Sequence, residues 1–346
     1  MRDGPVPAPR EQGWLRIVLA LAAFLLVPHA PGFPAFVPVV ETLLLLLPAL
    51  TVCFIVGWWS GGSFAVAMVW LALTVWLYVL PAPRGTGTAY YDLARAWGLL
   101  VAGSFGVVCL VGRQSTLLHR ALAAIGIAAL LGVVLSALGK LDVREAQRVF
   151  AGEYATRNAE SAAVLQESSR IIGERLPEAA SFASRFAAAR VEGEDAMARL
   201  AAPLYPALLA LEALAACALA WALHHRLSRT RIGSPLAPLR TFGFSDQLIW
   251  ALVAGITFLV LPSFAPLSGL GKNLVVFFGA LYTLRGYGIF AWFSSRRAAV
   301  VGAVVAIATL PLSLVTVPAA LGLGLSDTWF DWRRRAAPEG SGRRGT

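Results

Sequence analysis

The sequence predicts an all-α protein: a polytopic α-helical transmembrane bundle of eight or nine spans, with an inserted charged helical segment. The first observation is composition, because 58% of the 346 residues are hydrophobic and 14% are charged, with a mean hydropathy of +0.70. An ordinary globular domain is about half apolar and about a quarter charged. The second is that the apolar residues lie in long uninterrupted runs, and the third is that arginines cluster in short loops at the ends of those runs. These features are typical of a protein inserted in a lipid bilayer.

Residues 1–139 are predicted to form the N-terminal transmembrane helices. Apolar runs of about 17–25 residues are long enough to cross a bilayer, and this region holds five candidates: 14–28, 36–57, 61–80, 96–112 and 120–139. The first is rather short and imitates a signal peptide. A cut after Ala30 would place Pro28 at the third position before it, where a small residue is needed. We therefore predict that this helix is retained.

Residues 140–200 have a different composition, with ten acidic and nine basic residues. Four glutamates recur every seven residues, at Glu153, Glu160, Glu167 and Glu174. Alternating charges with alanine-rich filler predict a solvated helix or a pair of helices, broken near Pro177. Two interpretations stay open: a helical connector that lies against the membrane domain, or an element that docks a partner or gates the protein.

Residues 201–325 are predicted to form the C-terminal transmembrane helices, with runs at 202–223, 245–266, 272–294 and 298–324, and 326–346 form a basic tail. Arginines in short loops mark the cytoplasmic side. The loop arginines all fall on one side of the membrane if the N-terminus is cytoplasmic, and we therefore predict that orientation. These residues are Arg2, Arg10, Arg16, Arg113, Arg120, Arg226, Arg229, Arg231, Arg240, Arg296 and Arg297. Nine full spans would place the basic residues 332–335 and Arg343–Arg344 outside, so eight true spans with both termini inside are favoured.

Three charged residues are expected at membrane depth: Glu41, Glu212 and Arg285. A charge at the bilayer centre costs roughly 2.5–3.5 kcal/mol on insertion scales, and such residues usually face a bundle interior or a watery cavity. We predict that Arg285 pairs with Glu212 or with a bound anionic group. Two alternatives stay open: the pair is purely structural, or Arg285 snorkels to the surface.

Polar residues also lie at two helix ends. Lys272 and Asn273 follow a glycine-rich turn, and a helix N-terminus attracts anions; with Arg285, Glu212 and Glu41 they form the predicted substrate-binding set. The alternative interpretation, without a ligand, is that Lys272 marks the membrane–water interface and Asn273 caps the helix. At the other end, the spacing of Asp327, Asp331 and Arg335 predicts that they share one helical face. Trp329 and Trp332 are expected to anchor that segment at the lipid headgroups.

The sequence contains no convincing catalytic motif. There is no phosphate-binding loop, no nucleophile elbow and no zinc-protease signature, and the glycines of "GLGLSD" (322–327) are interpreted as a loosened helix end. Cys53, Cys109 and Cys217 each lie inside an apolar run without paired spacing, which predicts neither disulfides nor a zinc site. We expect no enzyme activity, no cofactor, no metal and, despite a net charge of +10, no nucleic-acid partner.

Three segments carry a resemblance to a known family: "FGFSDQLIWALV" (242–253), "GKNLVVFFGALYTLRGYGIF" (271–290) and "LGLGLSDTWFDWRR" (321–334). They resemble the YybS-like family of bacterial integral membrane proteins, which has no assigned function. That family is distantly similar to the substrate-binding subunits of energy-coupling-factor transporters. The resemblance implies a multi-pass protein of the bacterial cytoplasmic membrane that binds a small molecule, with a membrane or cytoplasmic ATPase partner.

Two functional hypotheses follow. The first is a membrane protein that binds or transports a small solute in an intramembrane polar pocket. The second is a non-transporting scaffold or assembly factor that docks partners through residues 140–200. Polar groups at membrane depth favour the first.

Overall fold

The computed structural model describes residues 14–30, 32–34, 36–83, 85–112, 115–139, 142–294 and 310–335. Within these ranges every regular element is helical and there is no β-strand, which confirms the predicted all-α class. The chain divides into two compact units, Met1–Leu236 and Ala237–Thr346. The predictions made for residues 1–13, 113, 295–309 and 336–346, which include the start of the last apolar run and the end of the basic tail, lie outside the described residues.

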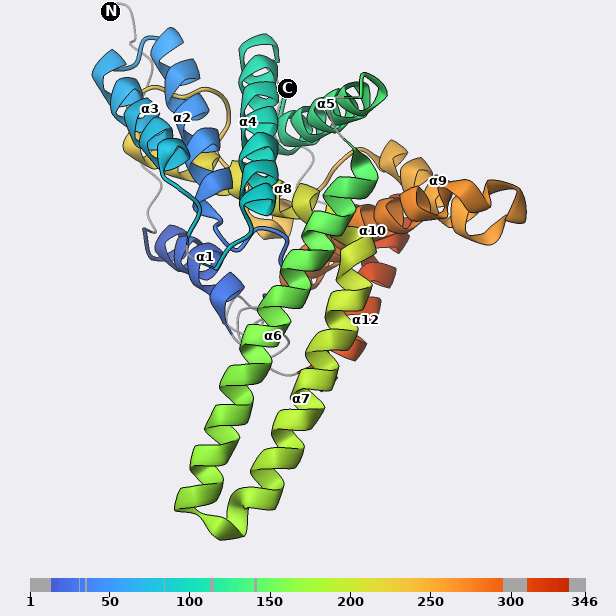
Figure 1. Cartoon of the computed structure of the whole chain (residues 1–346). Helices are drawn as coiled ribbons and strands as arrows, with labels where there is room; N and C mark the ends of the chain where they lie inside the picture. The colour runs from blue at the N-terminus through green and yellow to red at the C-terminus, as the bar shows by residue number, and fades with distance from the viewer. Residues whose placement is uncertain are drawn as a thin grey trace, which may run out of the picture. The chain divides into compact units, whose positions relative to one another are not determined.

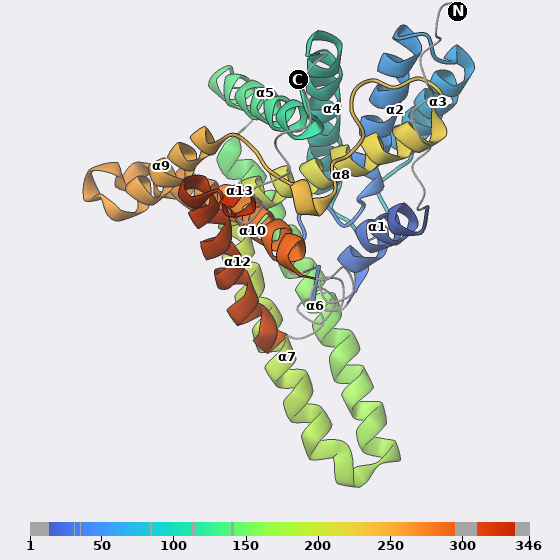
Figure 2. The same cartoon turned by 180° about the vertical axis from the view of Figure 1, so that it is seen from behind.

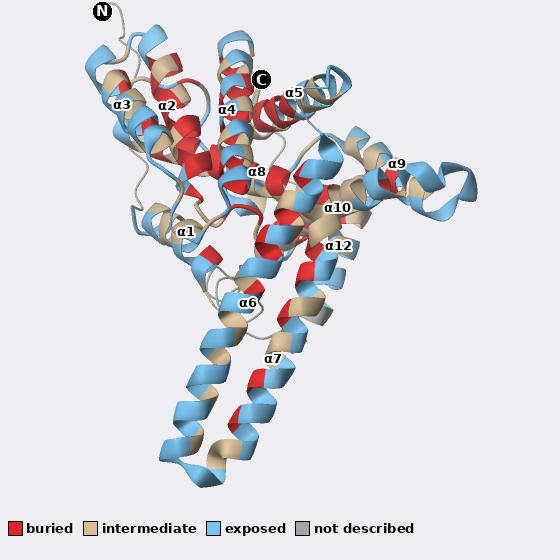
Figure 3. Cartoon of the chain, in the orientation of Figure 1, coloured by how far each residue is buried: buried red, intermediate tan, exposed pale blue. Residues whose placement is uncertain are grey.

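The apolar runs of the first unit form helices α1 (Trp14–Leu26), α2 (Leu43–Trp59), α3 (Phe64–Val79), α4 (Thr88–Val111), α5 (Leu117–Ala137) and α8 (Tyr205–Leu227) (Figure 1). Helix α2 packs against α3, α4 and α8, and most of its residues are buried (Figure 3). One close approach depends on glycine, because a Cβ built on Gly98 would lie 2.4 Å from the carbonyl oxygen of Leu44. The core of this unit therefore surrounds α2.

The structure supports a multi-pass membrane protein, but not the predicted number of spans. Four helical stretches among the described residues are long and apolar enough to cross a membrane: Thr88–Val111, Leu117–Ala137, Pro177–Leu227 and Pro262–Phe293. The remaining apolar helices are shorter. Helix α2, with 17 residues, rises only about 26 Å, whereas the hydrocarbon core is about 30 Å thick. The count of eight or nine spans is therefore not confirmed.

Residues 140–200 contain a helical hairpin, formed by α6 (Val143–Arg175), a 3-10 turn at Pro177–Ala179 and α7 (Ala180–Ala201) (Figures 1 and 2). Asp142 caps α6, since its carboxylate accepts a hydrogen bond from the amide of Arg144 at 2.8 Å. On the α7 side the seam between the two helices is lined by buried alanines, at Ala183, Ala187, Ala198 and Ala201. At the base of the hairpin, Phe150 and Tyr154 join the hydrophobic core around Tyr90 and Leu44.

The second unit consists of α9 (Ile249–Val260), α10 (Ser268–Phe293), α12 (Leu310–Phe330) and the short α13 (Trp332–Arg335). Helix α10 packs against both α9 and α12. Gly324 lies inside α12 and faces α10, because a Cβ built there would lie 1.9 Å from the carbonyl oxygen of Tyr282. The interpretation of "GLGLSD" as a loosened helix end was therefore wrong: this glycine lets two helix backbones approach closely.

Candidate functional site

Arg285 lies at the centre of an ion-pair network in the second unit. Its Nη1 atom donates to Asp246 Oδ1 at 2.7 Å, and its Nε atom donates to Asp327 Oδ2 at 2.9 Å. The guanidinium also lies over the Phe244 ring, 5.4 Å from the centroid, and 8% of the side chain is exposed. Its acidic partners are Asp246 and Asp327, so the predicted pair with Glu212 was wrong.

Asp327 joins this network to the end of the unit. Its Oδ2 atom also accepts from Arg333 Nη2 at 3.1 Å, and its Oδ1 atom accepts from the amide of Trp332 at 3.0 Å. Both carboxylate oxygens are thus occupied, in a side chain that is 1% exposed. Arg333 in turn donates to the carbonyl oxygens of Arg240 and Phe242. This arrangement favours a structural role for Arg285, because Asp327, the buried one of its two acidic partners, is bonded at both oxygens.

The other residues at this end differ from expectation. Asp331 has a φ of 45° and separates α12 from α13, so the predicted shared face of Asp327, Asp331 and Arg335 on one continuous helix was wrong. Trp332 donates from its indole to Ser326 Oγ at 3.0 Å, whereas Trp329 is exposed. At the start of α10, Lys272 is exposed and Asn273 donates to the carbonyl oxygen of Gly269 at 2.8 Å.

The first unit contains a polar pocket of about 440 Å³. We use the name polar pocket for the space lined by His29, Gly32, Pro34, Val40, Glu41, Gly85, Thr86, Glu153, Thr156, Arg157, Asn158, Glu160, Ser161, Val164, Leu165, Arg190 and Glu194. These residues come from the segment before α2, the loop between α3 and α4, and both helices of the hairpin. Its volume falls in the range of about 300–1,000 Å³ that is typical of small-molecule sites.

Glu41 is the predicted site residue that lines this pocket. Its carboxylate accepts a hydrogen bond from the Tyr90 hydroxyl at 3.0 Å and from Thr86 Oγ1 at 3.4 Å. Glu212 lies behind the same wall, where its Oε2 atom accepts from the amide of Val39 at 3.1 Å. Its Oε1 atom is buried without a hydrogen-bond partner among the described residues. The structure thus brings Glu212 to the segment that carries Glu41, two residues away at Val39.

Arg157 connects the hairpin to the segment before α2. Its Nε atom donates to Glu153 Oε1 at 3.0 Å, and its Nη1 atom donates to the carbonyl oxygen of Val37 at 3.0 Å. The guanidinium lies 4.8 Å from the centroid of the Tyr90 ring. Burial by itself lowers the pKa of Arg157, but Tyr90, Glu153 and Glu41 raise it further than burial lowers it, so the guanidinium stays charged.

Glu194 is held at the opposite wall of the pocket. It accepts from Ser161 Oγ at 2.7 Å and from Arg190 Nε at 3.1 Å. Asn158, which also lines the pocket, donates to Asp195 Oδ1 at 3.1 Å. Glu153 is therefore neutralised by Arg157, and Glu194 by Arg190, each four residues away in the same helix. Neither carboxylate needs a ligand for charge compensation.

The charges in the pocket do not balance. Four glutamates and two arginines line it, and the two arginines are paired with Glu153 and Glu194. Glu41 and Glu160 form no ion pair with any residue that the structure describes. The pocket therefore has an acidic excess.

Sequence reasoning missed most of these residues. Glu153 and Glu160 belong to the seven-residue glutamate series, but so do Glu167 and Glu174, which pair with Arg170 on the exposed part of α6. The periodicity therefore marks one helix and does not show which members face a pocket. Asp246, 39 residues before Arg285 in the chain, had a stronger signal, since it is an acid inside one of the segments that carry the family resemblance.

Replacement of Arg157 by lysine is expected to loosen the segment before α2. Lysine keeps the charge but lacks the planar fork that reaches both Glu153 and the Val37 carbonyl. One charge-assisted hydrogen bond contributes roughly 1.5–3 kcal/mol, so hydrogen exchange at residues 37–41 should accelerate by about tenfold or more. The matched control is Arg148→Lys in the same helix, where the pair with Glu145 is exposed. Equal exchange in both variants would contradict this role.

Comparison with known proteins gives a match to a protein family. The sequence model of a family described as predicted membrane protein (DUF2232) matches residues 160–328. No curated protein and no solved structure matches the chain. The matched range contains Asp246, Arg285 and Asp327 and six of the residues that line the polar pocket. The finer likenesses to YybS-like proteins and transporter subunits stay predictions. Over residues 160–328 this chain is therefore similar to the DUF2232 family of predicted membrane proteins, a family of unknown function.

Proposed function

We propose that the protein is a membrane-embedded receptor for a small solute that carries a positive charge, and that the polar pocket binds it. The observation that carries this proposal is the acidic excess: Glu41 and Glu160 line the pocket and form no ion pair among the described residues. A carboxylate in a partly desolvated site favours a cationic group that replaces its lost hydration.

The remaining groups complete a recognition site for a polar molecule. Thr86, Thr156 and Ser161 supply hydroxyls. Val164 and Leu165 supply an apolar wall. An amine or guanidinium on one side of a solute, with a hydroxyl or carbonyl on the other, satisfies both kinds of group. Diamines, polyamines and basic amino acids have this chemistry.

Binding is tested with the purified full chain in lipid nanodiscs. We expect spermidine, putrescine or arginine to raise the unfolding temperature in a concentration-dependent manner, and glutamate or citrate to leave it unchanged. Glu41→Gln and Glu160→Gln should each weaken binding by tenfold or more, or about 1.4 kcal/mol. The matched control is Glu167→Gln, which removes an exposed carboxylate from the same helix as Glu160 and lies outside the pocket.

Two outcomes would contradict the proposal. Binding of anions in preference to cations would show that the acidic excess does not select the ligand. Equal losses of affinity in Glu160→Gln and Glu167→Gln would show that the hairpin charge and not the pocket attracts the solute. Transport is the further step of this proposal, and uptake of a bound amine into proteoliposomes tests it separately from binding.

A second candidate function is docking through residues 140–200. It is favoured by the exposed apolar residues of the hairpin, which include Phe182, Phe186 and Leu200. A scaffold would use this surface while the polar pocket stayed a structural feature.

A further inference from the structure

Glu212 places a carboxylate beside the hydrophobic core of the first unit. It lies on α8, three residues after Leu209 and four residues before Ala216, so the three side chains share one face of that helix. Leu209 and Ala216 belong to the core that also contains Val39 and Tyr154. The Oε1 atom of Glu212 is itself buried. Removal of an ionised carboxylate from water is costly unless hydrogen bonds or charges replace its hydration.

Hydrogen bonds replace only part of the hydration of Glu212. Its Oε2 atom accepts from the amide of Val39 at 3.1 Å, whereas Oε1 has no hydrogen-bond partner among the described residues. The hydroxyl of Tyr154, a side chain that is 1% exposed, also has no hydrogen-bond partner in this part of the chain. The two groups are close enough for the charge of Glu212 to act on Tyr154. A buried donor and a buried acceptor left unmatched in one region require an explanation, such as a bound ion or a functional role.

The charges around Glu212 are unequal. Arg157 of α6 attracts its ionised form, and Glu41 repels it. The Arg157 guanidinium is already paired with Glu153 at 3.0 Å and lies 5.9 Å from the centroid of the Tyr154 ring. Burial raises the pKa of Tyr154 against the smaller, opposite effect of Arg157, so this hydroxyl stays a neutral donor. One cation thus faces three carboxylates, and Glu212 can become neutral while Arg157 keeps its pair.

The other helices packed against α8 add no charge beside Glu212 in the part of the chain that the structure describes. Helix α2 contains no charged residue. Arg16 of α1 is exposed, and Arg120 of α5 lies over a tryptophan about two and a half turns further along α8. On α4, Asp92 and Arg95 are paired with each other. The titratable side chains nearest on α8 and α4 are the tyrosines Tyr205 and Tyr90.

Glu212 is linked to the polar pocket through the segment before α2. The carbonyl oxygen of Val37 accepts from Arg157, the amide of Val39 donates to Glu212, and Glu41 of the same segment lines the pocket. A neutral carboxyl group still has an acceptor oxygen, so Oε2 keeps the Val39 hydrogen bond when Oε1 carries a proton. Protonation therefore changes the charge behind the pocket wall and leaves the wall held in place.

We propose that Glu212 is a proton-binding site that exchanges its proton for the cationic solute in the polar pocket, an inference that rests on the proposed function. Without solute, Oε1 carries the proton. A cation beside Glu41 and Glu160 stabilises the ionised form, because charges interact strongly in a partly desolvated site. The O–H bond then breaks, its electron pair stays on Oε1, and the proton passes to water. By linkage, the proton weakens cation binding by the factor by which the cation weakens proton binding.

The first test observes the proton directly by infrared difference spectroscopy of the full chain in lipid nanodiscs. Without solute, a change from about pH 6 to about pH 9 should remove the carbonyl stretch of a protonated carboxyl group. Glu212→Gln should lack this band, since glutamine cannot ionise but keeps an oxygen that can accept from the Val39 amide. Putrescine added near pH 7 should reduce the band of the unmodified chain by at least half.

The second test measures putrescine affinity at two pH values. Putrescine is used because its two amines stay charged from pH 6 to pH 8. A higher pH ionises Glu212 in the unmodified chain, which favours the cation, whereas Glu212→Gln keeps the neutral side chain of the protonated state. At pH 8 this variant should bind putrescine at least fivefold more weakly than the unmodified chain. At pH 6 the difference should fall below twofold.

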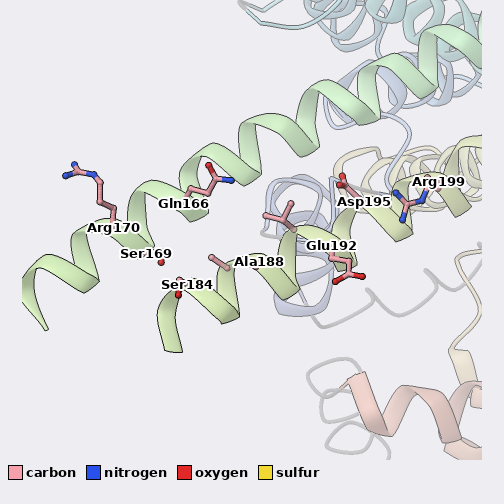
Figure 4. Close-up of a pocket in the computed structure, with 10 residues that line it drawn as sticks. Gln166, Ser169, Arg170, Ser184, Ala188, Glu192, Asp195 and Arg199 are labelled. Carbon is pink, nitrogen blue, oxygen red and sulfur yellow. The ribbon is translucent and has the colours of Figure 1, made fainter. Parts of the chain in front are cut away.

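Glu192→Gln is the matched control. Glu192 is an exposed carboxylate of the hairpin and lines a groove of about 650 Å³ between α6 and α7 (Figure 4), and it does not line the polar pocket. Its replacement removes the same charge from the chain as Glu212→Gln does. The infrared band and the pH dependence of putrescine binding should both stay as in the unmodified chain. A monodisperse elution profile for each variant shows that it is folded.

Three results would overturn the proposal. A missing band, or one that persists in Glu212→Gln, would show that Glu212 does not hold the proton. If putrescine binds but leaves the band unchanged, or binds with the same pH dependence in Glu212→Gln, the exchange is excluded while the proposed function stands. If no cation binds at any pH, the proposed function fails and the exchange fails with it, even where the band is present.

Discussion

Replacement of Gly286 by alanine is expected to disrupt the packing of α10 against α12 and to unfold the second unit at a lower temperature. A Cβ built on Gly286 would lie 1.8 Å from the carbonyl oxygen of Ala320, and it would also meet the Cα atom of that residue at 3.0 Å. Because these are backbone atoms, no rotamer change relieves the overlap. Small residues at helix–helix contacts in membranes allow such close backbone approach.

The size of this effect follows from the need to move one helix. Overpacking of a well-packed core typically costs about 1–3 kcal/mol and occasionally more, and we expect the upper end here. A drop of about 5 °C or more in the unfolding temperature should result, measured by intrinsic fluorescence in detergent. The partner glycine on α12, Gly324, should behave in the same way, since its Cβ would lie 1.9 Å from the Tyr282 carbonyl oxygen.

Gly279 provides the matched control in the same helix. A Cβ built on it would meet no atom within 4 Å, and alanine is a better helix former than glycine by roughly 0.5–1 kcal/mol. Gly279→Ala should therefore be neutral or slightly stabilising. If Gly279→Ala and Gly286→Ala lowered the unfolding temperature equally, the close contact between α10 and α12 would not be what stabilises this unit.

Replacement of Asp327 by alanine is expected to have a comparably large effect. It removes the carboxylate that accepts from both Arg285 and Arg333, and Arg285 is left 8% exposed with Asp246 as its remaining acidic partner. Removing one member of a buried ion pair costs roughly 3–5 kcal/mol, and here Arg285 keeps only the largely exposed Asp246 as an acidic partner. The unfolding free energy of the purified chain measures this loss.

A double variant distinguishes a lost pair from general damage. Arg285→Met combined with Asp327→Leu removes both charges, and we expect it to be less destabilising than Asp327→Ala alone. Asp331→Ala is the matched control, since Asp331 is 58% exposed and lies 3.9 Å from an exposed Arg334, and exposed pairs contribute little. If the double variant loses as much unfolding free energy as Arg285→Met and Asp327→Leu lose together when made singly, the pairing is excluded.

Much of the fold could be predicted because hydrophobic runs report directly on helices. The break at Pro177 and the helical character of residues 140–200 follow from charge patterning and from proline chemistry. The number of spans could not be predicted in the same way. Run length in the sequence overestimates helix length in the structure, as residues 36–42 show: they belong to an apolar run, but they form irregular backbone before α2.

The site was harder to predict because it depends on contacts between distant segments. Glu41 could be singled out as a costly charge in an apolar run, but its neighbours Glu153 and Arg157 are more than a hundred residues further along the chain. For the Arg285 network the segments could be predicted from the sequence, but the contacts between them could not. Its three segments could be recognised as a set from their motifs, yet nothing in the sequence showed that Asp327 would be buried and bonded at both oxygens.

The alanine seam of the hairpin determines which genetic screens can detect it. Truncation to alanine, the usual way to map important positions, changes nothing at Ala183, Ala187, Ala198 or Ala201, since these side chains are already that small. A saturation library would instead record strong intolerance there, because any larger side chain pushes the two helices apart. A region that looks silent in one experiment would thus be among the most sensitive in the other.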